Sequence, residues 1–176
     1  DRAGKRPGAC KLAFAGSSFK PGVYSGKSMN FSPTLLIGAT GLLGPYITRA
    51  FSSGNHQIFG AARKNADITL NVTSADAVKK AIQHIRPKIV VYAAGLTSVD
   101  LCEKTPSDAF ALNRNGVVNV VRALRSTDTV FVYISTDQAY PDRPGPHKEA
   151  DAAPVNVYGK SKLAGEQAAL DRKSVV

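Results

Sequence analysis

The stretch TLLIGATGLLG, residues 34–44, predicts a strand, a tight turn and a helix in direct succession. Its first half is a buried apolar strand, and its second half carries three glycines, Gly38, Gly41 and Gly44. Glycines at such a turn let the backbone bend sharply, and the N-terminus of the following helix offers unpaired N–H donors and about half a unit of positive charge. We expect this turn to hold the pyrophosphate of a dinucleotide cofactor, because the motif stands in the required context.

Short apolar runs and helical periods alternate along the chain after this turn. Further strands are expected in HQIFGAA (56–62), DITLNV (67–72), KIVVYAAG (88–95) and TVFVYIST (129–136). Apolar helix faces are expected at Leu43, Ile47, Ala50 and Phe51, at Ala77, Val78, Ala81, Ile82 and Ile85, and in a long helical region over residues 107–125. This alternation predicts right-handed crossovers and a Rossmann-type, doubly wound parallel α/β sheet with helices on both sides.

The first 33 residues show no such periodicity and are rich in Gly, Ser, Pro and Lys. We expect residues 1–33 to form a disordered leader and residues 34–176 to form the nucleotide-binding domain. Residues 1–28 hold six basic side chains and one acid, which is half of the net charge of +10. Met29 is the expected natural start, and the alternative is that the basic leader is an organelle-targeting segment.

Composition argues against several other classes of function. The basic residues form no stripe interleaved with aromatic platforms, which a nucleic-acid site would require. The two cysteines and three histidines have no metal-binding or redox spacing, and no apolar run approaches the ~20 residues that span a bilayer. We therefore expect a reduced, cytoplasmic protein without metal, membrane or nucleic-acid partners.

The residues after the second expected strand bear on the choice of cofactor. An acidic residue there would bind the adenosine ribose and select NAD, whereas this chain has Arg63 and Lys64. Arginine binds a phosphate through two charge-assisted hydrogen bonds. The pair favours NADP(H), with NAD(H) as the alternative, unless it is an ordinary solvated loop end.

The stretch VYGKSKLAGE, residues 157–166, places Tyr158 and Lys162 four positions apart in a predicted helix. Residues at this spacing share one helix face, with Cβ atoms ~5–6 Å apart. They are therefore either a catalytic acid with its tuning cation or two ordinary surface residues.

Five stretches in order, GATGLLG, AAGLTSVDLCE, LNRNGVVNV, YISTDQAYP and NVYGKSKLAGE, resemble the extended short-chain dehydrogenase/reductases. The resemblance runs from about Thr34 to the C-terminus. It is strongest to the dTDP-4-dehydrorhamnose reductase-like members of the NAD-dependent epimerase/dehydratase superfamily.

This resemblance implies roles for individual residues. Thr136 would hydrogen-bond the substrate carbonyl, Tyr158 would donate the proton, and Lys162 would bind the nicotinamide ribose and strengthen the tyrosine as an acid. Asn113 would organise a proton relay or simply pack its helix, while Asp100 and Glu103 would be structural. The implied cofactor-binding residues are Gly38, Thr40, Gly41, Leu42, Leu43, Gly44, Arg63, Lys64, Asn71, Val72, Ala93, Ala94, Gly95, Thr97, Asn113, Tyr158 and Lys162.

The resemblance implies an NADPH-dependent reductase of a keto group on a nucleotide-linked deoxysugar. Two alternatives stay open: a sugar-nucleotide epimerase or dehydratase, and a non-catalytic, NADP-binding subunit like that of methionine adenosyltransferase. The expected partners are a nucleotide-sugar substrate and either a second copy of the chain or a partner enzyme.

Two departures from the family pattern affect these expectations. Relatives commonly have an aromatic or branched residue after STD, where this chain has Gln138, so substrate contacts are left open. The chain ends at DRKSVV, which is typical of the beginning of a sixth strand. We therefore expect a cofactor domain that lacks most of the substrate domain and is weak or inactive by itself.

Overall fold

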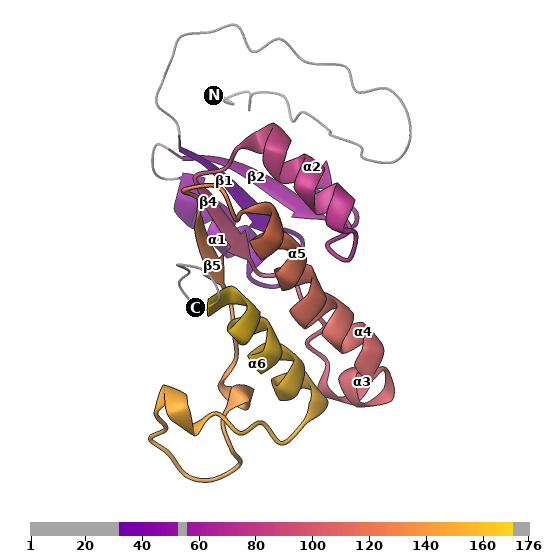
Figure 1. The fold of residues 1–176 in the computed structure, drawn as a ribbon, viewed down its shortest axis with the longest axis vertical. Helices are drawn as coiled ribbons and strands as arrows, with labels where there is room; N and C mark the ends of the chain where they lie inside the picture. Colours follow the sequence, from indigo (N-terminus) through magenta and orange to yellow (C-terminus); the bar gives the residue numbers. More distant parts are fainter. Residues whose placement is uncertain (1–31, 53–55, 171–176) are drawn as a thin grey trace, which may run out of the picture.

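The computed structural model describes residues 32–52 and 56–170, which contain a five-stranded parallel sheet (Figure 1). The strand order is β3-β2-β1-β4-β5, and all four pairs of neighbouring strands are parallel. The strands are β1 (Ser32–Ile37), β2 (His56–Ala62), β3 (Ile68–Thr69), β4 (Ile89–Tyr92) and β5 (Val130–Tyr133). The order reverses between β1 and β4, as in doubly wound folds. The predicted fold class is confirmed.

The connections between the strands place helices on both faces of the sheet. Across the sheet, the connection from β1 to β2 runs in one direction and the connection from β3 to β4 runs in the opposite direction. Because such crossovers are right-handed, α1 and α2 lie on opposite faces of the sheet. Helix α5 packs against α2 and α6 and extends the layer that α2 begins (Figure 1). The helices are α1 (Gly44–Ser52), α2 (Ala75–Ile85), α3 (Val99–Lys104), α4 (Pro106–Phe110), the π-helical turn η1 (Ala111–Asn115), α5 (Gly116–Ala123), the 3-10 turns η2 (Asp137–Ala139) and η3 (Glu149–Asp151), and α6 (Val157–Leu170).

The core lies between the sheet and the layer of α2 and α5. Strands β1 and β4 sit in the middle of the sheet, and most of their side chains are fully buried. Continuous apolar runs are what strands covered on both faces require. The predicted face of α2 also lies in this core, with Val78, Ala81 and Ile82 buried.

The prediction that α1 buries an apolar face is wrong in part. Leu43 precedes the helix and is 45% exposed, and Ala50 is exposed as well. Ile47 and Phe51 are only half-buried, and Gly44 is the one buried residue of the helix. Periodicity shows which side chains share a face, but it does not show whether another element covers that face.

The predicted boundaries differ from the structure at several places. Strand β1 begins at Ser32, two residues before the expected domain start, while β3 contains only Ile68 and Thr69 of the predicted run 67–72. The expected leader, up to residue 31, and the expected sixth strand in DRKSVV lie outside the described residues. Within the described part of the chain, no helix is both long and apolar enough to cross a membrane.

Helix α2 ends at a residue whose backbone conformation is unfavourable for an amino acid with a side chain. Arg86 adopts the left-handed conformation with φ 49°, and its N–H donates to the carbonyl of Ile82. For residues other than glycine this conformation costs roughly 1–2 kcal/mol. Glycine is the common residue at such helix ends because it has no Cβ.

We therefore expect Arg86→Gly to raise the free energy of unfolding by about 0.5–1 kcal/mol, because relief of strain is partly offset by the entropy of the unfolded glycine. Urea denaturation with an unchanged slope measures the effect. Arg86→Ala is the matched control, since it removes the same side chain but keeps the strain. A glycine variant no more stable than the alanine variant would contradict the explanation.

Candidate functional site

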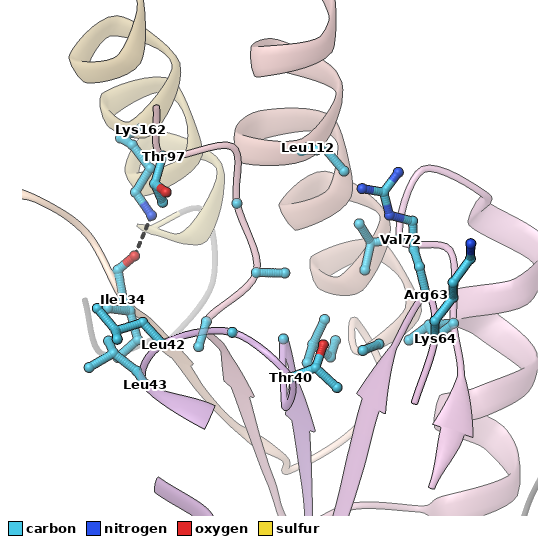
Figure 2. Close-up of a pocket in the computed structure, with 18 of the residues that line it drawn as sticks. Thr40, Leu42, Leu43, Arg63, Lys64, Val72, Thr97, Leu112, Ile134 and Lys162 are labelled. Atoms are coloured by element: carbon cyan, nitrogen blue, oxygen red, sulfur yellow. Dashed lines mark hydrogen bonds between the residues drawn. The ribbon is translucent and has the colours of Figure 1, made fainter. Parts of the chain in front are cut away.

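A cavity of about 980 Å³ opens at the carboxyl ends of β1, β2, β4 and β5 (Figure 2). Its walls come from the glycine turn after β1, the loops after the other strands, the π-helical turn and the first two turns of α6. Carboxyl ends of neighbouring parallel strands meet at one edge of a sheet, and ligands of open α/β folds bind where the strand order reverses.

The glycine turn passes very close to the end of β4. Gly38 has φ 95°, and a Cβ there would lie 2.6 Å from the amide nitrogen of Ala94. Only glycine fits this position, because both the conformation and the lack of space exclude a side chain. Gly44 is also required for packing, since a Cβ on it would collide with the backbone of Ala39.

Two basic side chains stand at one end of the cavity. Arg63 and Lys64 follow β2 directly, line the cavity and are exposed. Figure 2 shows both side chains pointing up along the wall, at the end opposite Lys162. The cavity therefore carries positive charge at both ends, which suits an elongated anionic ligand.

Lys162 is a buried cation at the other end of the cavity. It is only 5% exposed, donates to the carbonyl oxygen of Ile134, and its Nζ lies 4.2 Å from the centroid of the Tyr133 ring. Burial lowers the pKa of Lys162 to about 8, and the nearby Glu166 carboxylate raises it in part. Glu166 is itself held by a hydrogen bond from the Ser135 hydroxyl.

Tyr158 lies one turn before Lys162 on α6 and lines the same cavity. Thr136 lies in the loop after β5, where its side chain caps η2: its hydroxyl accepts from the Gln138 N–H and donates to Asp137. Ser135, one residue earlier, lines the cavity, whereas Thr136 does not.

Asn113 lies behind the cavity wall rather than in it. Its side chain is completely buried, accepts from the Leu96 N–H, and donates to the Leu96 carbonyl and the Ser161 hydroxyl. Its backbone carbonyl accepts from the Tyr133 hydroxyl at 3.2 Å. All polar atoms of this side chain are therefore engaged in holding the helix against the loop after β4.

The π-helical turn is stabilised from the sheet. A π turn widens the helix and disturbs its regular hydrogen bonds, and such turns are frequent at functional sites. Here the Tyr92 and Tyr133 hydroxyls donate to the carbonyls of Leu112 and Asn113. Burial raises the pKa of both tyrosines, so both remain donors at neutral pH.

The loop after β3 is held by a residue that the sequence reasoning missed. Asn119 of α5 donates to the Val72 carbonyl at 2.9 Å, and Val72 lines the cavity. Asn71 does not line the cavity, and its side chain accepts from the backbone and hydroxyl of Thr73. A polar residue on the buried face of a helix was the available signal for Asn119.

The structure brings most of the predicted site residues together. Fourteen of them line the cavity: Gly38, Thr40, Gly41, Leu42, Leu43, Arg63, Lys64, Val72, Ala93, Ala94, Gly95, Thr97, Tyr158 and Lys162. Gly44, Asn71, Asn113 and Thr136 are not lining residues. The lining residues that the sequence reasoning missed are Ile37, Ala62, Asn65, Leu70, Leu112, Ile134 and Ser135.

Most of these missed residues lie at strand ends beside predicted ones. Extending each strand-end prediction by a residue or two would have found them. Leu112 is different, because only the π turn brings it to the wall. Among residues 32–52 and 56–170, no group of three or more His, Cys, Asp or Glu could hold a metal ion.

The buried charge of Lys162 predicts a pH dependence of stability. Its pKa is about 8 in the folded chain against 10.5 for a fully solvated lysine, so the unfolded chain binds more protons between these pH values. Stability therefore rises with pH across this window. Between pH 7 and 11 we expect the free energy of unfolding of the wild type to rise by roughly 3 kcal/mol relative to that of Lys162→Met.

Chemical denaturation of both proteins across this range measures the difference. Lys160→Met serves as the control, because Lys160 is exposed on the same helix and its removal should leave the pH profile unchanged. A gap between wild type and Lys162→Met that stays constant with pH would refute the expected shift.

Comparisons with known proteins agree with this architecture. The family model described as RmlD substrate binding domain matches residues 32–176. The dTDP-4-dehydrorhamnose reductase of Mycolicibacterium smegmatis is 33% identical over 142 residues, and methionine adenosyltransferase 2 subunit beta of Pongo abelii is 32% identical over 141. These matches cover 79% and 78% of this chain but 42% of each relative.

A solved structure shows the same likeness in three dimensions. The dTDP-4-dehydrorhamnose reductase of Bacillus anthracis, solved in complex with NADP, aligns with a TM-score of 0.75 and 33% identity. The alignment covers 82% of this chain and 51% of that one, so this chain spans about half the length of its relatives. The chain belongs to the family that the RmlD substrate binding domain model describes, the dTDP-4-dehydrorhamnose reductase-like members of the NAD-dependent epimerase/dehydratase superfamily.

Proposed function

We propose that this chain is the cofactor-binding part of an NADPH-dependent reductase that acts on a keto group of a nucleotide-linked deoxysugar. One observation carries the proposal: Tyr158 and Lys162 enter, from a single helix, the same cavity that the glycine turn lines. A pair of ordinary surface residues would have no reason to share that cavity, and a lysine would have no reason to be buried. Reductases among the relatives support the substrate class.

The residues of the cavity fit a nicotinamide dinucleotide. The close crossing at Gly38 brings the backbone of the turn to the cavity floor, and α1 begins there without an acidic residue in its first turn. The positive end of that helix is therefore free of its own counter-charge and suits a pyrophosphate. Arg63 and Lys64 would hold the adenosine end, and Lys162 would lie at the nicotinamide ribose.

The chemistry divides between the cofactor and the chain. When bound, the dinucleotide supplies the hydride that reduces the carbonyl carbon of the substrate. Tyr158 donates its hydroxyl proton to the carbonyl oxygen, and Thr136 turns its hydroxyl from Asp137 to orient that oxygen with a hydrogen bond. The Lys162 ammonium stabilises the phenolate that remains, and its burial strengthens this effect because little water screens the charge.

The basic pair after β2 makes the choice of cofactor testable. We expect Arg63→Ala to weaken NADPH binding by about 1.5–3 kcal/mol, the range for a hydrogen bond to a charged group, and to leave NADH binding nearly unchanged. Titration of cofactor fluorescence or calorimetry measures both affinities. Arg122→Ala removes an exposed arginine of α5 that does not line the cavity, so it controls for net charge. Equal losses for both cofactors would assign the pair another role.

A second candidate function has specific support. The relatives include methionine adenosyltransferase 2 subunit beta, at 32% identity over 141 residues. The chain would then bind a dinucleotide as part of a regulatory subunit, and its partner would be the catalytic subunit of methionine adenosyltransferase, the synthetase. A retained Tyr158–Lys162 pair is compatible with both functions, so turnover has to separate them.

The deciding assay measures NADPH oxidation with dTDP-4-keto-6-deoxy-mannose. It uses this chain beside a longer version that carries the C-terminal half of the relatives. We expect turnover mainly from the longer version, because orienting the substrate can be worth ~7–11 kcal/mol of the barrier. Tyr158→Phe should abolish that turnover while NADPH still binds. An active phenylalanine variant would refute the mechanism, and capture of the synthetase without turnover would favour the regulatory subunit.

A further inference from the structure

Gln138 contacts the two segments that carry the proposed catalytic residues Thr136 and Tyr158. Its backbone N–H donates to the Thr136 hydroxyl at 3.3 Å. Its side-chain oxygen accepts from the Asn156 amide at 2.7 Å. Thr136 caps η2 after β5, and Asn156 immediately precedes the helix that carries Tyr158. One residue therefore joins two segments that are about twenty positions apart in the chain.

Asn156 depends on this contact for its orientation. Its side-chain oxygen accepts from the Gly159 N–H at 2.7 Å, which is the bond of a helix N-cap, while its NH₂ donates to Gln138. An amide has its acceptor on one side and its donors on the other. Gln138 holds the donor side, so the acceptor faces the first turn of α6, where Tyr158 lies.

The backbones of the two segments also touch. A Cβ at Gly159 would collide with the Gln138 carbonyl oxygen, so η2 and α6 pack with no space for a side chain between them. The contact keeps Gln138 beside the residue that follows Tyr158. A shift of η2 would therefore be transmitted directly to the first turn of α6.

We propose that Gln138 is a positioning residue that fixes the Thr136 hydroxyl relative to the Tyr158 hydroxyl. The inference rests on the proposed reductase function, in which both hydroxyls meet the same carbonyl oxygen. Reactions of this kind lose rate steeply when reacting groups are misplaced by even 1 Å. A phenylalanine or a branched aliphatic residue at this position could keep the N–H bond to Thr136 but has no side-chain atom that could accept from Asn156.

A second contact at the N-terminus of α6 shows why loss of the Gln138 side chain should leave the fold intact. The Val157 N–H donates to the Glu103 carboxylate of α3 at 2.7 Å, which ties the helix start independently of η2. Removing the Gln138 side chain should therefore loosen the cap without unfolding the helix. Gln138 is also exposed, so its replacement leaves no cavity in the core.

The first test compares amide hydrogen exchange in Gln138→Met, Gln138→Glu and Gln167→Met. Methionine keeps the length of the side chain but cannot replace the acceptor, whereas glutamate retains it. Gln167 is exposed on the same helix and gives the matched control. In Gln138→Met we expect the Gly159 amide to exchange about five- to tenfold faster, with the glutamate and control variants at the wild-type rate. An unchanged Gly159 rate in the methionine variant would overturn the proposal.

The second test measures kinetics in the longer version used for the reductase assay. Gln138→Met should lower kcat by about ten- to a hundredfold with an unchanged KM for NADPH, and Gln138→Glu should restore kcat. A kcat that does not respond, despite faster Gly159 exchange, would also overturn the proposal. If the wild type itself shows no turnover, the reductase function fails, and the exchange result alone then decides whether Gln138 positions the two segments.

Discussion

The close approach of Gly38 to the end of β4 is the constraint on which the rest of the site depends. A backbone with φ 95° and no side chain lets the turn after β1 cross the Ala93–Ala94 peptide, where a Cβ would come within 2.6–2.8 Å. The crossing places the start of α1 at the carboxyl edge of the sheet, beside the loops after β2 and β4. A side chain at Gly38 would displace the turn from the end of β4, and the two ends of the cavity would then move apart.

The other end of the cavity depends on a buried polar layer between the sheet and the helices. The Tyr133 hydroxyl lies between the carbonyls of Asn113 and Lys162, at 3.2 and 3.4 Å, and thereby joins the π turn to α6. Gly165 allows this contact, because a Cβ there would collide with both Tyr133 and the Asn113 carbonyl. Buried polar groups without partners are costly, so such a layer tolerates little displacement.

Lys162 shows that this arrangement carries a cost in stability. Burial disfavours the charged form of a lysine, and the pKa of about 8 reflects that cost. The carbonyl of Ile134, the Tyr133 ring and the Glu166 carboxylate offset it in part. An apolar residue would avoid this cost, whereas the role proposed for Lys162 would gain strength from the absence of water.

The amino-acid sequence by itself determined the alternation of strands and helices, the parallel sheet, the glycine turn and the helical pairing of Tyr158 with Lys162, because these follow from local periodicity and short spacings. The tertiary structure alone decided that α1 leaves Leu43 exposed, that Leu112 reaches the cavity and Asn113 does not, and that Gln138 joins Thr136 to the cap of α6. These features depend on which distant segments cover a face or offer a hydrogen-bond partner, and a pattern within one segment carries no information about its neighbours in space.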